Sequence, residues 1–181
     1  MTSQSEARTP RRPLSRERVL RAAIDLADRD GIEALTMRNL AQGLGVEAMS
    51  LYHHVRNKDA LLDGVVEVVV EEINAAVAPV DGTSAQDWKA AMRERILTAR
   101  AVLLRHPWAP ALIETRPSIS LAVMRYYDDL LALMRTGGFS YDLAHHALHA
   151  LGSRALGFTQ ELFAPDDLSP RTTAACRCPT G

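Results

Sequence analysis

Cysteine is scarce in this sequence, and long hydrophobic runs are missing. The two cysteines, Cys176 and Cys178, are too few for a disulfide framework and indicate a reducing compartment. No run of about eighteen apolar residues occurs, and the polar, arginine-rich N-terminus lacks the apolar segment of a secretory signal. The sequence therefore predicts a cytoplasmic protein with no membrane-spanning helix.

The motifs of common enzymes are missing as well. The chain has no nucleophile elbow, no phosphate-binding glycine loop and no acid–histidine pair at a plausible spacing. His145 and His149 stand four apart beside His146, a spacing found in zinc sites, but no third ligand or glutamate base accompanies them. We interpret them as pocket, interface or surface histidines, with metal or ligand contact as the alternative. The sequence predicts no enzyme, no metal and no cofactor, and a metal-dependent hydrolase using His145 and His149 is the competing hypothesis.

Net charge is small, but the charges are unevenly distributed. The formal charge of −1, with 47% hydrophobic and 24% charged residues, is typical of a folded globular protein. Between Arg8 and Arg21, however, six arginines stand against one acid, Glu17. Residues 1–14 are predicted to be a flexible basic arm. Two interpretations of the arm stay open: a solvated tail, or an arm that contacts DNA non-specifically or in the minor groove.

Capping residues and apolar spacing predict two helices near the N-terminus. Ser15 is suited to cap a helix whose apolar residues recur every three or four positions until Gly31. Thr36 is suited to cap a second, shorter helix that ends at Gly45. No alternating strand pattern and no internal repeat appears along the chain. The expected fold class is therefore all-α.

A third short helix and a long fourth one should follow. The third begins at Glu47 and ends near Val55, before a polar turn in which Asn57 can adopt a left-handed conformation. Residues 58–77 keep a helical apolar period, although their many β-branched residues make a strand the competing interpretation. A helix is favoured, because an unbroken strand of about twenty residues would be unusual.

The second half of the chain is predicted to form a separate helical domain. A helix over 87–105 is followed by a break marked by Pro107, Pro110 and Pro117. Ser118 should cap a helix that runs to Gly137, and another is expected over 141–163. The predicted organisation is a basic arm at 1–14, a domain of short helices at 15–62 with a connecting helix to about 78, a joint at 79–84, a second helical domain at 85–165, and a disordered tail at 166–181.

Residues 36–55 fit a helix-turn-helix, in which one helix braces a second that reads the DNA major groove. Leu51 and Val55 share one face of the reading helix and should pack against the brace. The opposite face then carries side chains suited to base edges, thymine methyls and phosphates. Its members are Met49, Ser50, Tyr52 and His53, with Ala48 and His54 at the margins. Thr36, Arg38 and Lys58 stand at helix starts, where phosphates are favoured.

These residues resemble the signature of the tetracycline repressor (TetR) family. The resemblance is carried by Leu35-Thr36-Met37-Arg38-Asn39-Leu40-Ala41, Leu44-Gly45-Val46 and Leu51-Tyr52-His53-His54-Val55-Arg56-Asn57-Lys58-Asp59-Ala60-Leu61-Leu62, and spans roughly residues 15–75. The positions that match the family's DNA contacts are Thr36, Arg38, Ala48, Met49, Ser50, Tyr52, His54 and Lys58. Ala48 and Met49 depart from the tetracycline repressor itself, so the resemblance does not fix the operator sequence.

The resemblance implies an all-helical homodimer with a helix-turn-helix DNA-binding domain at 15–62 and a helical effector-binding and dimerisation domain at 85–165. Such a protein binds double-stranded operator DNA and releases it when a small molecule, apolar or aromatic, occupies the C-terminal domain. Family members pair through two C-terminal helices per subunit, and only one, at 141–163, is evident here. A truncated regulator with weakened dimerisation is therefore a further hypothesis. Bulky side chains in this half are interpreted as core, with some lining a pocket. They are Trp88, Trp108, Met92, Met124, Met134, Tyr126, Tyr127 and Phe158. No ligand-binding residue is assigned.

Overall fold

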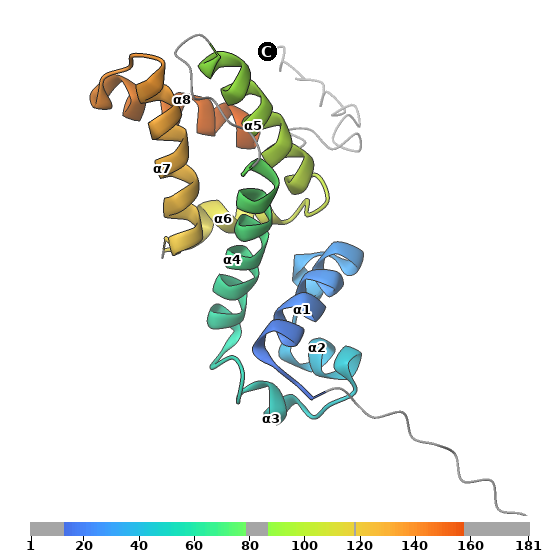
Figure 1. Ribbon diagram of the computed structural model, residues 1–181. Helices are drawn as coiled ribbons and strands as arrows, with labels where there is room; N and C mark the ends of the chain where they lie inside the picture. The colour runs from blue at the N-terminus through green and yellow to red at the C-terminus, as the bar shows by residue number, and fades with distance from the viewer. Residues whose placement is uncertain (1–12, 79–86, 118, 158–181) are drawn as a thin grey trace, which may run out of the picture.

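The computed structural model describes residues 13–78, 87–117 and 119–157, with side chains as far as residue 150. These residues form an all-α fold, as predicted (Figure 1). No helix among them is long and apolar enough to cross a membrane. The arm before residue 13, the joint at 79–84, Ser118, Phe158, both cysteines and the tail lie outside the described residues.

The first two helices begin and end where the capping residues predict. The Ser15 side chain accepts a hydrogen bond from the Arg18 amide at 3.2 Å, and α1 (Arg16–Asp30) runs from there to Gly31. A short 3-10 turn, η1 (Ile32–Ala34), leads to α2 (Met37–Leu44), which Thr36 caps. Gly45 ends α2 at φ 66°, a left-handed conformation that glycine adopts without strain.

Two predictions for the next segment need correction. Regular helix in α3 covers only Ala48–Leu51, and turns continue as far as the Val55 amide, which bonds to the Leu51 carbonyl at 2.9 Å. Asn57 is extended (φ −161°), not left-handed, because its side chain accepts a hydrogen bond from the Ala60 amide at 2.8 Å. Asn57 is thus the N-cap of α4 (Lys58–Val77), and the helical interpretation of 58–77 is confirmed.

The second half adds four helices, one of them not predicted. The helices are α5 (Trp88–Leu103), α6 (Ala109–Thr115), α7 (Leu121–Thr136) and α8 (Tyr141–Gly157). The prolines were expected to break the chain here, but Pro110 lies in the first turn of α6, where its missing N–H has no helical partner to lose. Ser120, not Ser118, caps α7 by accepting from the Val123 amide at 3.3 Å. Of the helix expected over 141–163, residues after 157 are not described.

One hydrophobic core runs through both halves. It includes Leu20 of α1, Leu40 of α2, Leu51 of α3, Val65 of α4 and Trp108 before α6, all at most 8% exposed. Two smaller clusters lie between α5, α7 and α8 and between α4 and α7. In Figure 1, α4 extends from the α1–α3 group toward the group formed by α5–α8. The shared core means that α1–α3 are packed onto the second half and not merely tethered to it.

Candidate nucleic-acid interface and apolar cavity

The reading segment is fixed by its apolar face. Leu51 is 0% exposed and Val55 is 4% exposed, and both belong to the core that also contains Leu40 and Ala41 of α2. Leu44 and Val46 pack against that core at the turn. Because a short helix is stabilised mainly by packing, this buried face determines which side of α3 meets solvent.

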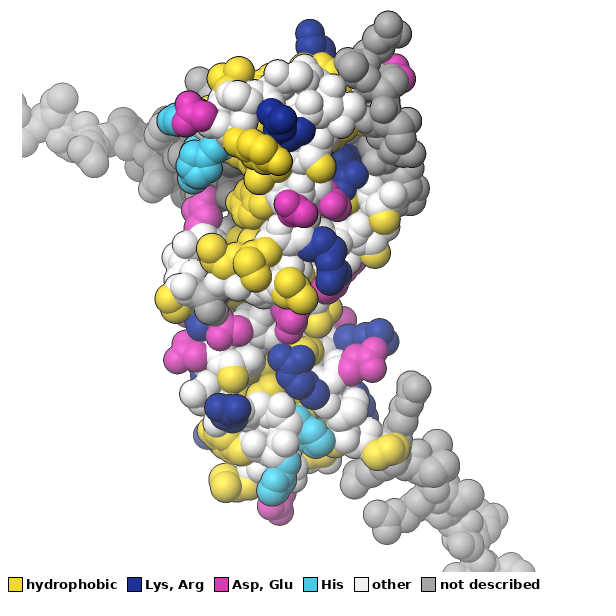
Figure 2. Space-filling view, turned by 60° about the vertical axis from the view of Figure 1, so that its left-hand side comes forward, with side chains coloured by type: hydrophobic (Ala, Val, Ile, Leu, Met, Phe, Trp, Pro, Cys, Tyr) yellow, Lys and Arg dark blue, Asp and Glu magenta, His cyan; other side chains and the backbone are white. Residues whose placement is uncertain are grey.

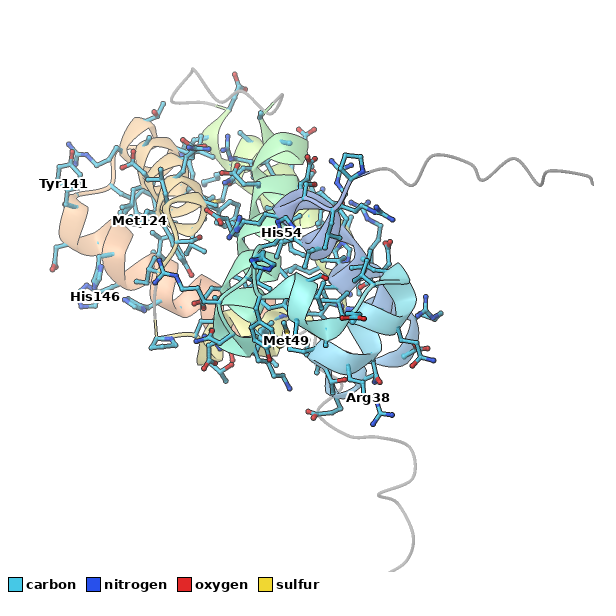
Figure 3. All side chains as sticks on the ribbon, turned by 90° about the horizontal axis from the view of Figure 1, so that it is seen from below. Arg38, Met49, His54, Met124, Tyr141 and His146 are labelled. Carbon is cyan, nitrogen blue, oxygen red and sulfur yellow. The ribbon has the colours of Figure 1, made fainter. Side chains whose placement is uncertain are left out.

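The opposite face is exposed at one end of the molecule. Met49 is 71% exposed and Tyr52 is 44% exposed, while His53 is exposed and Ala48, Ser50 and His54 are half-buried. Seen from this end, Arg38 lies on α2, Met49 on α3 and His54 just after α3 (Figure 3). Figure 2 shows histidine and basic side chains together at the same, lower end. The structure therefore brings the predicted reading residues onto one surface.

Basic groups flank this surface. Arg38 and Lys58 are exposed and form no ion pair with any residue that the structure describes. Lys58 is the first residue of α4, at the positive end of the helix dipole. Thr36 is half-buried, and its hydroxyl already accepts a hydrogen bond from the Asn39 amide at 3.1 Å. Arg56, which the sequence analysis did not select, is also exposed beside Lys58 and is a further phosphate-binding candidate.

An apolar cavity lies among α4, α5, α6, α7 and α8 and encloses about 110 Å³. Its walls are almost entirely aliphatic, for example Ile73, Ile96 and Leu103. The lining residues that carry polar groups are Arg100, Tyr126 and Tyr127. Burial raises the pKa of Tyr126 to about 12, so this phenol stays neutral at physiological pH.

The bulky residues of this half divide between cavity, core and surface. Met92, Tyr126 and Tyr127 line the cavity. Trp108 and Met134 are buried core residues, and Trp88 packs edge-on against Phe139 with ring centroids 5.0 Å apart. Met124 is exposed, at 51%, on α7. The cavity could not be predicted from the sequence because five helices must be placed before it exists.

The histidine cluster does not form a metal site within the described residues. His145, His146 and His149 are all exposed on α8, and the rings of His145 and His149 meet edge to face at 4.6 Å. No group of three or more histidine, cysteine, aspartate or glutamate side chains in the described part of the chain could hold a metal ion. Nothing here supports the hydrolase hypothesis.

Polar contacts that the sequence did not predict join the two halves. His106 is 7% exposed between the carboxylates of Asp28 on α1 and Glu72 on α4. Arg116, at the end of α6, donates to Asp63 at 2.6 Å and to Asp59 at 3.3 Å, both in the first turns of α4. The His106 contacts thus join the segment before α6 to α1 and α4, and the Arg116 contacts join the end of α6 to α4, the helix that begins with Lys58.

Comparison with known proteins identifies the protein family to which this chain belongs. The family model described as bacterial regulatory proteins, tetR family, matches residues 19–65, and that of the tetracyclin repressor-like C-terminal domain matches residues 80–172. The chain belongs to the TetR family. An HTH-type transcriptional regulator of Saccharopolyspora erythraea is 36% identical over 70% of this chain and 51% of its own length. The class D tetracycline repressor protein of Escherichia coli is 35% identical over 82% and 66%.

A solved TetR-family structure has the same arrangement of helices. ActR of Streptomyces coelicolor, in complex with actinorhodin, superposes with a TM-score of 0.72 and 28% identity over 81% of this chain and 67% of ActR. The chain spans about half of the Saccharopolyspora regulator and about two thirds of the other two proteins.

Proposed function

We propose that the protein is a sequence-specific DNA-binding transcriptional regulator, a repressor that a small-molecule effector releases from its operator. The observation that carries the proposal is the orientation of α3: Leu51 and Val55 are buried while Met49 and Tyr52 are exposed. This is the arrangement that a major-groove reading helix requires. The proposal assigns no catalytic reaction to the chain and places it in the cytoplasm, where the bacterial chromosome is.

The proposal assigns base contacts and backbone contacts to different residues of this surface. Met49 and Ala48 contact thymine methyl groups, Ser50 bonds a base edge, and His53 and His54 contact a purine or a phosphate. Tyr52, Thr36, Arg38 and Lys58 contact the sugar-phosphate backbone, and Arg56 adds a further cation. Phosphate contacts fix the register of the protein on DNA, while the base contacts select the operator.

The apolar cavity is the proposed effector site. Its aliphatic walls and two tyrosines suit an apolar or aromatic molecule. The matched ActR structure contains actinorhodin, which supports an aromatic effector by analogy. An effector that binds one arrangement of the helices better than the other shifts the population between a DNA-binding and a released state.

A homodimer is proposed because operators of helix-turn-helix proteins commonly contain two half-sites one helical turn apart. Exposed hydrophobic side chains offer a surface for pairing. They cover parts of the upper and middle molecule in Figure 2. Four of those on α7 and α8 are more than half exposed: Leu121, Met124, Tyr141 and Leu143. Sedimentation at micromolar concentration tests this step.

The proposal is tested by selecting DNA from a random library and measuring affinity across a salt series. Affinity for the selected duplex should exceed that for random DNA by a factor of about 1,000 or more at physiological salt. Equal affinity at every salt concentration would rule out specific regulation. Met49→Ala should weaken discrimination at a thymine, whereas Leu97→Ala, which changes an exposed leucine on α5, should leave the DNA affinity unaltered.

A further inference from the structure

The lining of the apolar cavity carries a positive charge that no acidic lining residue neutralises. Among its described lining residues Arg100 is a cation, and none is an aspartate or glutamate. Arg100 lines the cavity and is also exposed, so it lies at the mouth, where the apolar wall meets water. A guanidinium at the edge of an apolar wall is attracted to any anion that enters.

Four other arginines around this region have acidic partners among the described residues, and Arg100 has none. Arg95 pairs with Asp129 at 2.9 Å, and Arg125 pairs with Glu71 at 3.3 Å. Arg105 bonds Glu72, and Arg116 bonds Asp59 and Asp63. Within the part of the chain that the structure describes, Arg100 forms no ion pair. Its charge is therefore available to a ligand in a place where neighbouring arginine charges are already neutralised.

The rest of the cavity lining favours ring-containing molecules without a second charge. Tyr126 and Tyr127 meet edge to face with ring centroids 6.1 Å apart, and both line the cavity. Aromatic edges and faces pack favourably against another ring. Burying a second ionised group against Ile73, Ile96 and Leu103 would cost free energy without a partner to offset it.

We propose that the cavity takes a ring-containing organic acid with a single anionic group, and that Arg100 selects this acid over neutral molecules of the same shape. The carboxylate sits at the mouth against the Arg100 guanidinium, and the apolar ring enters among α4, α5 and α7. This inference rests on the proposed effector site, because it names the chemical class of molecule that the site accepts.

The test uses the full chain without DNA and two probes of matched shape, 2-naphthoate and 2-naphthamide. Calorimetric titration should show that the wild-type protein binds the carboxylate about five- to tenfold more tightly than the amide, since a charge-assisted hydrogen bond is stronger than a neutral one. Raising the salt concentration should reduce this preference. Arg100→Gln should bind both probes equally, at about the wild-type affinity for the amide.

Arg93→Gln is the matched control, because Arg93 is exposed on the same helix, does not line this cavity and forms no ion pair with a described residue. It removes the same charge and should keep the preference. Three results would overturn the proposal: equal binding of both probes by the wild type, no binding of either probe, or a preference that survives Arg100→Gln. Loss of the preference in Arg93→Gln would also overturn it by indicating a general charge effect. Since no DNA is present, failure here is distinguishable from failure of the repressor proposal.

Discussion

His106 Nδ1 lies 2.9 Å from both carboxylate oxygens of Asp28, although 78 positions separate the two residues in the chain. Trp108 donates its indole N–H to the same carboxylate at 2.7 Å. Asp28 belongs to α1, and His106 and Trp108 lie between α5 and α6. One acidic side chain thus holds the first helix of the reading half against the segment that joins two walls of the cavity.

Asp28→Asn should destabilise the fold by about 1–3 kcal/mol, because charge-assisted hydrogen bonds to two largely buried rings are weakened. Urea unfolding measures the change. Asp25→Asn is the control, since Asp25 is exposed on the same helix and has no described partner. The stability of this variant should stay within about 0.5 kcal/mol of that of the wild type. Equal effects of the two substitutions would show that the Asp28 contacts are not stabilising.

Tyr126 should make the protein less stable in alkaline solution. Burial raises the pKa of Tyr126 from 10.0 to about 12, so the folded state disfavours the phenolate relative to the unfolded state. The contribution of Tyr126 to the free energy of unfolding is fully present below pH 10. It is lost as the pH rises toward 12, and the loss amounts to up to about 2–3 kcal/mol. Urea unfolding at pH 9 and pH 11 measures this loss. Tyr126→Phe should reduce the loss, whereas Tyr127→Phe, which changes a 41% exposed tyrosine, should not.

Alanine substitution should destabilise the protein at Gly137 and stabilise it at Gly43. A Cβ at Gly137 would lie 2.6 Å from the indole ring of Trp88, a rigid group packed against Phe139, so Gly137→Ala should cost about 1–3 kcal/mol. A Cβ at Gly43, inside α2, would meet nothing within 4 Å. Gly43→Ala should therefore stabilise the protein by up to about 1 kcal/mol. Thermal unfolding of both variants checks the signs, and a stable Gly137→Ala protein would contradict the close packing.

Lys58 should contribute to DNA affinity without contributing to sequence preference. Its ammonium is exposed at the start of α4, beside the reading surface. Lys58→Ala should reduce the slope of log affinity against log salt by about 1 and weaken binding to selected and random DNA alike. Lys89→Ala is the control, because Lys89 is exposed on α5 above the Trp88 ring. A loss confined to the selected sequence would assign Lys58 to base reading.

The sequence predicted the parts of this structure that depend on local chemistry. Helix ends are set by side-chain caps at Ser15 and Thr36 and by backbone conformation at Gly31 and Gly45. These interactions involve residues only a few positions apart in the chain. Asn57 was interpreted wrongly because an asparagine after a helix and an asparagine before a helix have the same sequence signal, and its bond to Ala60 decides between them.

Long-range relationships were not predictable in the same way. The segment around Leu51 and Val55 could be oriented from its own periodicity, so its buried and exposed faces were predicted before any helix was placed. The buried position of His106 depends on where α1 and α4 pass, and Arg100 became a candidate only when the lining of the cavity was known. The ion pairs of Arg116 could not be predicted either, because its acidic partners are 53 and 57 positions away in the chain.

Arg116 should be coupled energetically to Asp63. The Arg116 side chain is 13% exposed, and its Nε donates to Asp63 at 2.6 Å. A double-mutant cycle with Arg116→Gln and Asp63→Asn, measured by urea unfolding, should give a coupling energy of about 1–3 kcal/mol, because the pair is partly shielded from water.

Arg125 and Glu71 provide the comparison for that cycle, since their side chains are 52% and 47% exposed and their nearest atoms are 3.3 Å apart. Their coupling energy should be below about 1 kcal/mol, as is usual for a solvent-exposed pair. Because Arg116 follows α6, whose Ile113 lines the cavity, a strong first coupling would show that this wall is fastened to the start of α4, next to the reading surface. A coupling below about 1 kcal/mol in the Arg116–Asp63 pair as well would mean that this contact does not fasten α6 to α4.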